Sequence, residues 1–258
     1  MIPQPVKLFY QAHGQGEPLV VIHGLLGSSS NWSTTSELLG RRLQVFAVDL
    51  RNHGNTPHSN EFSFDSMAED LKYFMESQNL RQAMILGHSL GGRVAMEFAD
   101  RYPEMVSKLI VVDVAPKAYP PIHNEMIDAM LALDLGMYES AKEVVVALAA
   151  AVPSIQVRNF LTKNISRLSN GRLCWKVNLQ AIRDNIDILG CSTNFKNSYL
   201  KPVLFIRGEL SDYVLEEDES TIWSEYPHAQ IAPIAGAGHW VHIDAKERFI
   251  ETVLKFTV

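Results

Sequence analysis

The feature that most constrains the fold of this chain is the pentapeptide Gly87-His88-Ser89-Leu90-Gly91. An apolar run, Ala83 to Leu86, precedes it, and a segment with helical spacing begins near Gly92. Gly-x-Ser-x-Gly between a strand and a helix makes a turn so sharp that the residues two positions either side of the serine must lack a Cβ. The turn raises the hydroxyl beside helix N–H groups that have no intrahelical partner and can stabilise an oxyanion. The pattern therefore predicts that Ser89 is a nucleophile.

The order of apolar runs along the chain indicates the fold class. Short runs rich in Val, Ile and Phe alternate with amphipathic segments, which predicts an α/β fold with a mostly parallel sheet and helices on both faces. We expect strands at residues 6–11, 18–23, 43–49, 83–88, 108–113, 202–207 and 228–234. We expect helices at residues 31–40, 65–78, 90–102 and 245–256. A chain of 258 residues is long enough for one such domain with an inserted subdomain.

Between Pro116 and Lys201 the strand signals stop. Apolar residues instead recur at helical spacing in three stretches, residues 126–133, 144–151 and 160–168. The segment is far longer than an ordinary loop. We therefore predict a core domain made of residues 1–116 and 201–258 and an inserted helical cap, residues 117–200, that covers the strand ends and builds the substrate pocket.

Composition excludes several classes of function. A net charge of −6 argues against a nucleic-acid binder. Residues 1–13 carry one lysine and no long apolar run, so we expect no signal peptide. The most apolar stretch, residues 144–152, is far shorter than the roughly 20 residues that span a bilayer, so we expect no membrane insertion.

The two cysteines, Cys174 and Cys191, form neither a disulfide framework nor a metal-ligand pattern. Their small number favours a reducing compartment, and we expect a cytoplasmic protein. We expect no metal and no organic cofactor, because the chemistry that Ser89 implies needs neither.

A serine hydroxyl becomes a nucleophile only when a base takes its proton and a carboxylate orients that base. His239 is the candidate base, because it follows the last predicted strand in the small-residue run Ala235-Gly236-Ala237-Gly238 and lies 150 residues after Ser89. His242 is a weaker rival. His23-Gly24-Leu25 closes the second predicted strand, where the N–H of Leu25 can share an oxyanion hole with the N–H of Leu90.

Other residues near these motifs are candidates for binding the substrate. We expect Trp240, next to the candidate base, and His23 to contact it. Three methionines are candidate lining residues of an acyl pocket, although methionines at this spacing commonly pack in a core; they are Met126, Met130 and Met137. The segment Asp49 to Gly54 also ends a strand, and we expect its carboxylate and arginine to brace loops near the site.

Two aspartates are candidates for the acid. The usual pattern after the strand that leaves the cap is Gly-Glu-x-Asp-x-x-Val; matching it to Gly208 and Val214 puts Ser211 at the acid position and Asp212 one residue late. Asp113 ends the strand next to that of the nucleophile, so it can also reach the histidine. We favour Asp113 and keep Asp212 as the alternative.

Five segments carry a family resemblance: His23-Gly24, Asp49-x-Arg51-Asn52-His53-Gly54, Gly87-His88-Ser89-x-Gly91-Gly92, Asp113-x-Ala115-Pro116 and Gly236-Ala237-Gly238-His239-Trp240-Val241-His242. Together they resemble the bacterial YbfF-type esterases of the α/β-hydrolase superfamily, in both halves of the sheet domain but not in the cap. The resemblance implies hydrolysis of short-chain acyl esters, with acyl-CoA thioesters also implicated, and it implies that Asp113 is the acid. Where this chain has Asp212, those relatives typically have a neutral residue.

We therefore expect a serine esterase for a small-molecule acyl ester or thioester of short to medium chain length, acting through an acyl-enzyme. Residues 144–183 hold six basic and no acidic residues, so the cap can attract a polyanionic leaving group such as coenzyme A, although a solvated basic face explains the same pattern. The alternatives are a serine-dependent carbon–carbon bond hydrolase, a cofactorless haloperoxidase and, more remotely, a non-catalytic binding module. The oligomeric state stays open.

Overall fold

The computed structural model describes residues 4–120, 123–191, 195 and 199–257. Within these residues a seven-stranded sheet has the order β1-β3-β2-β4-β5-β8-β9. The strands are β1 (Tyr10–His13), β2 (Pro18–Ile22), β3 (Gln44–Val48), β4 (Ala83–His88), β5 (Val106–Val112), β8 (Val203–Gly208) and β9 (Gln230–Ile234). Within this sheet only the pairing of β1 with β3 is antiparallel. The prediction of a mostly parallel sheet is confirmed.

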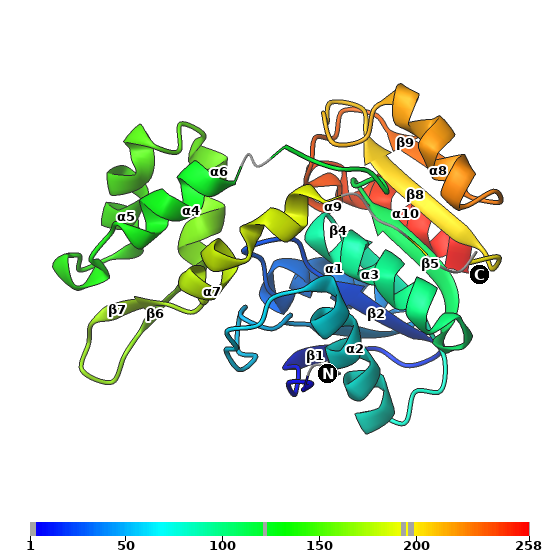
Figure 1. Ribbon diagram of the computed structural model, residues 1–258, viewed down its shortest axis with the longest axis horizontal. Coiled ribbons are helices and arrows are strands. Elements are labelled where there is room, and N and C mark those ends of the chain that lie inside the picture. Colours follow the sequence, from blue (N-terminus) through cyan, green and yellow to red (C-terminus); the bar gives the residue numbers. More distant parts are fainter. Residues whose placement is uncertain (1–3, 121–122, 192–194, 196–198, 258) are drawn as a thin grey trace.

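Helices cover both faces of this sheet (Figure 1). One face carries α1 (Ser33–Leu39) and α10 (Lys246–Thr257), and the other carries α2 (Phe64–Ser77), α3 (Leu90–Arg101) and α8 (Glu219–Glu225). Successive side chains of a strand point to opposite faces, so in β2 Val20 packs with the α2 and α3 side while Val21 packs with α1 and α10. In the described part of the chain no helix is long and apolar enough to cross a membrane.

Between β5 and β8 the chain leaves the sheet and forms a separate group of elements, green to yellow in Figure 1. They are α4 (Asn124–Leu131), α5 (Ala141–Ala147), α6 (Ile155–Leu161), α7 (Leu179–Asp184) and an antiparallel pair, β6 (Ile165–Arg167) and β7 (Leu173–Trp175). We call residues 123–191 the cap. Its buried side chains, such as Ile127 and Leu161, join the same apolar cluster as α2 and α3. The division into a core domain and a cap domain remains our proposal.

The remaining helical elements are short. The 3₁₀ turns are η1 (Ser29–Trp32), η2 (Pro103–Met105), η3 (Leu135–Met137), η4 (Leu148–Ala150), η5 (Thr162–Asn164), η6 (Ile186–Gly190) and η7 (Glu216–Asp218). A four-residue helix, α9 (Val241–Asp244), precedes α10. Neither α8 nor α9 was among the predicted helices.

Two predicted elements are wrong in position or type. The strand expected at residues 6–11 is β1 (Tyr10–His13), because the N–H groups of Val6 and Phe9 donate to the side chains of Asp70 and Thr56 instead of a strand. The helical spacing read across residues 160–168 ends within α6 and η5. Beyond them β6 and β7 form a hairpin, whose turn contains Asn170 and Gly171 with Gly171 at φ +86°. Asn-Gly is a hairpin signal, and the helical pattern obscured it.

Candidate active site

Ser89 lies in the turn between β4 and α3, with the strained backbone angles φ 53° and ψ −117°. The turn brings the backbone segments on either side of it into contact. A Cβ on Gly87 would lie 2.0 Å from the carbonyl oxygen of Gly91, and a Cβ on Gly91 would lie 2.4 Å from that of Ile22. Only glycine fits at either position, so the sequence pattern and the turn geometry agree.

Asp113 follows β5 directly and is completely buried, with φ at +51°. Its Oδ2 lies 2.8 Å from Nδ1 of His239, in the loop after β9. The N–H of Gly208 donates to Oδ1 at 3.0 Å, and the hydroxyl of Ser211 donates to Oδ2. A buried carboxylate with three donors is held in one orientation, so it fixes the ring of His239 and its tautomer.

Asp212, the alternative acid, lies exposed, and its side chain makes no hydrogen bond or ion pair to the residues that the structure describes. The structure therefore brings Asp113, and not Asp212, to His239. Ser211, at the register of the usual acid, makes its hydrogen bond to that same carboxylate. The register argument from Gly208 and Val214 thus located a polar position beside His239 that a serine occupies.

Tyr213 packs flat against His239, with ring centroids 3.7 Å apart and an interplanar angle of 18°. Burial, together with the nearby charge of Asp113, raises the pKa of Tyr213 to about 12, so its hydroxyl stays protonated at neutral pH. That hydroxyl lies 3.4 Å from Nε2 of His123. Sequence reasoning missed both residues; the only signal for Tyr213 was its place two residues after Ser211.

Two further histidines, both buried, lie close to His239. The ring of His88 donates through Nε2 to the carbonyl oxygen of His239 at 2.8 Å. His242, the weaker candidate base, stacks on Trp32 with ring centroids 4.0 Å apart. Burial lowers the pKa of His242 to about 3 and that of His88 well below its usual value. Both rings stay neutral near pH 7, and His239 alone of the three contacts the buried carboxylate.

The two amides proposed from sequence for the oxyanion hole lie beside Ser89. Leu90 is the first residue of α3, and Leu25 lies in the loop after β2. Both residues line one small cavity together with Ser89. The first N–H groups of a helix have no intrahelical acceptor, which leaves that of Leu90 available for an oxyanion.

The loop that carries Leu25 is held by imidazoles from both sides. His23 donates through Nδ1 to the carbonyl oxygen of Gly24 at 2.8 Å and accepts at Nε2 from the N–H of Leu50 at 3.0 Å. His23 borders the large cavity described below, but both its nitrogens are occupied. It therefore offers a substrate only ring surface.

Leu26, the next residue, has φ +58°, and both its N–H and its carbonyl oxygen form hydrogen bonds to side chains. Its N–H donates to Nε2 of His53 at 3.1 Å, and its carbonyl oxygen accepts from Nδ2 of Asn164 at 2.7 Å. Asn164 belongs to the cap and is buried. The cap thus contacts the loop of the candidate oxyanion hole directly.

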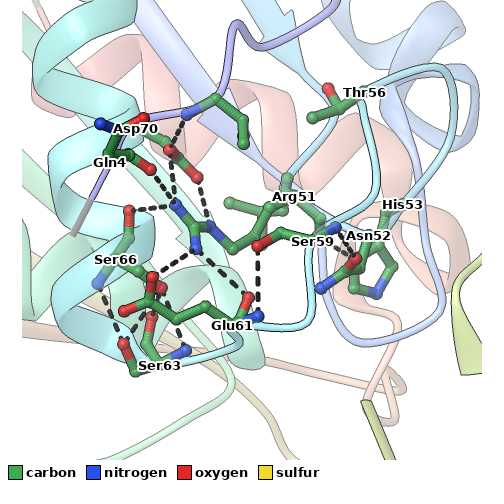
Figure 2. A network of polar contacts seen from close by, with 12 residues as sticks. Gln4, Arg51, Asn52, His53, Thr56, Ser59, Glu61, Ser63, Ser66 and Asp70 are labelled. Carbon is green, nitrogen blue, oxygen red and sulfur yellow. Dashed lines mark hydrogen bonds and ion pairs between the residues drawn. The ribbon is translucent and has the colours of Figure 1, made fainter. Parts of the chain in front are cut away.

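Arg51, after β3, forms a buried ion pair with Asp70 of α2 (Figure 2). Its Nε lies 2.7 Å from Oδ2 and its Nη2 lies 2.8 Å from Oδ1 of that carboxylate. Asp49 accepts from the N–H groups of Ser29 at 2.6 Å and Asn55 at 2.8 Å. Both side chains brace loops, in the manner expected from the sequence.

Two cavities open at Ser89, one enclosing about 40 Å³ and the other about 680 Å³. Trp240 and Met126 line the larger one. The other two methionines do not line either cavity, because Met130 is buried in the apolar cluster and Met137 is 78% exposed. Helical spacing could not separate these three positions.

Of the six basic residues in 144–183, Lys163 lines the large cavity. Others bind within the cap: Arg183 pairs with Asp128, Arg158 donates to the carbonyl oxygens of Val152 and Pro153, and Arg167 donates to those of Glu139 and Gly171. The basic character of the cap therefore presents little positive charge to the cavity. Among the described residues no cluster of three or more His, Cys, Asp or Glu side chains is arranged to hold a metal ion.

Comparisons with known proteins agree with this geometry. Residues 17–163 match the family model described as the alpha/beta hydrolase fold. A relative from Danio rerio, an sn-1-specific diacylglycerol lipase (ABHD11), is 34% identical over 98% of this chain and 83% of its own length. Esterase YbfF of Escherichia coli (strain K12) is 28% identical over 95% of each chain. A solved structure titled marine microorganism esterase superposes with a TM-score of 0.94 at 40% identity, covering 97% of this chain and 99% of its own.

Proposed function

This chain belongs to the α/β-hydrolase family as an esterase/lipase-type member, and we propose that it hydrolyses acyl esters through an acyl-enzyme formed on Ser89. The observation that carries the proposal is the hydrogen bond between His239 and the buried carboxylate of Asp113, which also accepts hydrogen bonds from Gly208 and Ser211. An imidazole held by such a carboxylate is a general base, and Ser89 lines the same cavity as this imidazole.

In the first half-reaction, Nε2 of His239 takes the hydroxyl proton of Ser89 while Oγ attacks the ester carbonyl carbon. The N–H groups of Leu25 and Leu90 stabilise the oxyanion of the tetrahedral intermediate. The bond from carbon to the alcohol oxygen then breaks, and His239 gives its proton to that oxygen. Asp113 stabilises the imidazolium that exists between these two proton transfers.

In the second half-reaction, water replaces the alcohol. His239 takes a proton from the water, whose oxygen attacks the acyl-enzyme carbonyl carbon, and the same two amides hold the new oxyanion. The bond from that carbon to Oγ of Ser89 breaks, and His239 returns its proton to Oγ. The products are the free acid and the free enzyme, with no redox change and no cofactor.

Relatives set the range of substrates for a first panel. The name of the Danio rerio relative includes diacylglycerol as a substrate, and the names of the other two relatives say only esterase. We favour simple acyl esters over coenzyme A thioesters. Of the six basic residues in the cap segment 144–183, Lys163 alone lines the large cavity, which gives a polyanionic leaving group little positive charge to bind. A dienoic diketone and a bromide–peroxide mixture complete the panel and test the carbon–carbon hydrolase and haloperoxidase alternatives.

The decisive experiment combines fluorophosphonate labelling with p-nitrophenyl butyrate hydrolysis for the wild type and Ser89→Ala. Peptide mapping is expected to find the label on Ser89 of the native protein and not of the heat-unfolded protein. The variant is expected to lose at least about 10⁴-fold in kcat with an unchanged thermal unfolding midpoint. Label at another residue, or an active Ser89→Ala protein, would contradict the assignment.

A further inference from the structure

The two cavities at Ser89 differ in their lining residues, and one difference is whether His239 is among them. They share Leu25, Ser89, His123 and Tyr213, so they meet where the ester carbonyl must lie. His239 lines only the large cavity. The reacting carbon therefore has one compartment on the side of the base and another on the side away from it.

The small compartment is narrow and partly open, and several of its walls are buried side chains. It encloses about 40 Å³, room for about three water-sized groups. Val114 and Leu189 are among its apolar walls. Arg93 also lines it and is only 4% exposed. Its two Nη atoms donate to the carbonyl oxygens of Leu189 and Cys191. A charged guanidinium tied to two backbone carbonyls does not yield to a longer alkyl chain.

The large compartment encloses about 680 Å³, within the range of sites that hold drug-sized ligands. Its aromatic wall is formed by Phe160 of α6 and Trp240, whose ring centroids lie 5.3 Å apart. Val157, also of α6, and Met126 of α4 extend this surface. It suits a large apolar group.

The chemistry decides which half of the ester enters which compartment. In the proposed mechanism His239 must deliver a proton to the departing alcohol oxygen, so the alcohol has to lie on the side that this ring lines. We propose that the large compartment binds the alcohol and the small compartment binds the acyl chain. The substrate class is then an ester of a short acid, up to about four carbons, with a bulky apolar alcohol. This inference rests on the proposed function and adds an orientation to it.

Two isomeric esters test the orientation. Octyl acetate and methyl nonanoate have the same atoms and release unbranched alcohols of similar basicity, octan-1-ol and methanol. They differ in which side of the carbonyl carries the long chain. We expect kcat/KM at least about tenfold higher for octyl acetate, because its chain enters the large compartment. Equal values, or a preference for methyl nonanoate, would overturn the assignment of the compartments.

Two variants give each compartment its own readout. Leu189→Ala enlarges the small compartment and is expected to raise the ratio of kcat/KM for methyl hexanoate to that for methyl butyrate about fivefold. Phe160→Ala removes part of the large wall and is expected to lower the ratio for octyl acetate to butyl acetate about fivefold. If Leu189→Ala changes the alcohol ratio and not the acyl ratio, the compartments are assigned the wrong way round.

The outcome for the orientation is separable from that for the function. Hydrolysis that depends on Ser89 but prefers methyl nonanoate keeps the esterase proposal and removes the orientation. Failure of every ester in the series, together with no fluorophosphonate label on Ser89, removes the esterase proposal and the orientation with it.

Discussion

The loops at the strand ends of the sheet and the cap hold their parts of the site by different forces. In the loops, hydrogen bonds from distant segments fix each polar group: Gly208 and Ser211 bind the carboxylate of Asp113, and His88 binds the backbone of His239. The cap supplies mainly apolar surface, such as Phe160 against Trp240. Directed bonds set reactive geometry within tenths of an ångström, whereas packing sets shape and volume. Changes in the loops should therefore remove rate, and changes in the cap should mainly alter selection.

The largest expected effect on the loop side comes from Asp113→Asn. The amide keeps the shape of the side chain but cannot stabilise the imidazolium, so kcat for p-nitrophenyl butyrate should fall about 10⁴-fold. Asp212→Asn is the matched control. The carboxylate of Asp212 is exposed, so this variant should retain full activity. Loss of activity in Asp212→Asn alone would transfer the acid role to the later loop and dissolve the contrast.

A second change sharpens the same point by moving the acid. The hydroxyl of Ser211 already touches the oxygen of Asp113 that binds His239. The double variant Asp113→Asn/Ser211→Asp therefore places a carboxylate near Nδ1 of the imidazole, and it should regain about tenfold in kcat over Asp113→Asn alone. Ser211→Ala in the same background removes the hydroxyl without adding charge and should recover nothing. Equal rates for the two double variants would show that Ser211 does not lie within reach of the ring.

Acid should destabilise the sheet portion and its loops more than the cap. The sheet portion holds several buried histidines that are neutral in the folded protein, whereas the described part of the cap holds one, His123. Burial lowers the pKa of His53 and of His242 to about 3, and in the cap it lowers the pKa of His123 to about 4. A histidine in the unfolded state has a pKa of about 6.5, so between about pH 3 and 6.5 the unfolded state binds the extra protons and stability falls as pH falls. Each such histidine contributes a slope approaching about 1.4 kcal/mol per pH unit.

Urea unfolding between pH 6 and pH 5 measures this slope. His53→Gln removes one of the groups and keeps an acceptor for the N–H of Leu26, so its unfolding free energy should depend on pH less steeply by about one proton. An unchanged slope in this variant would mean that His53 is not buried as a neutral ring.

The sheet portion was predictable because local signals and topology agree there. Glycines around Ser89, the apolar run of β4 and the position of Asp113 at the end of β5 each constrain the chain within a few residues. The parallel sheet then brings the ends of neighbouring strands together, which is why two segments far apart in sequence meet at His239. Register alone pointed to Ser211 as well, although its role as a donor to a carboxylate needed the three-dimensional contact.

The rest of the site depends on contacts that no local pattern encodes. Tyr213 stacks on His239 only because the loop after β8 turns back over the ring, and an isolated tyrosine in a loop carries no signal for this. In the cap, apolar spacing at residues 160–168 suited a helix as well as it suited the end of α6 followed by β6. The choice between them is made by pairing with β7, a non-local interaction.

The smallest expected effect tests the one place where the cap acts through a directed bond. Asn164 donates to the carbonyl oxygen of Leu26, next to the amide proposed for the oxyanion hole. In Asn164→Ala that carbonyl loses its partner and the loop gains freedom, so kcat should fall about fivefold, corresponding to one hydrogen bond of about 1 kcal/mol, while KM stays the same. Asn170→Ala, an exposed cap asparagine in the β6–β7 turn, is the control and should leave both constants unchanged. A rise in KM with constant kcat in Asn164→Ala would place the residue with the packing surfaces of the cap, and would make the division between rate in the loops and selection in the cap complete.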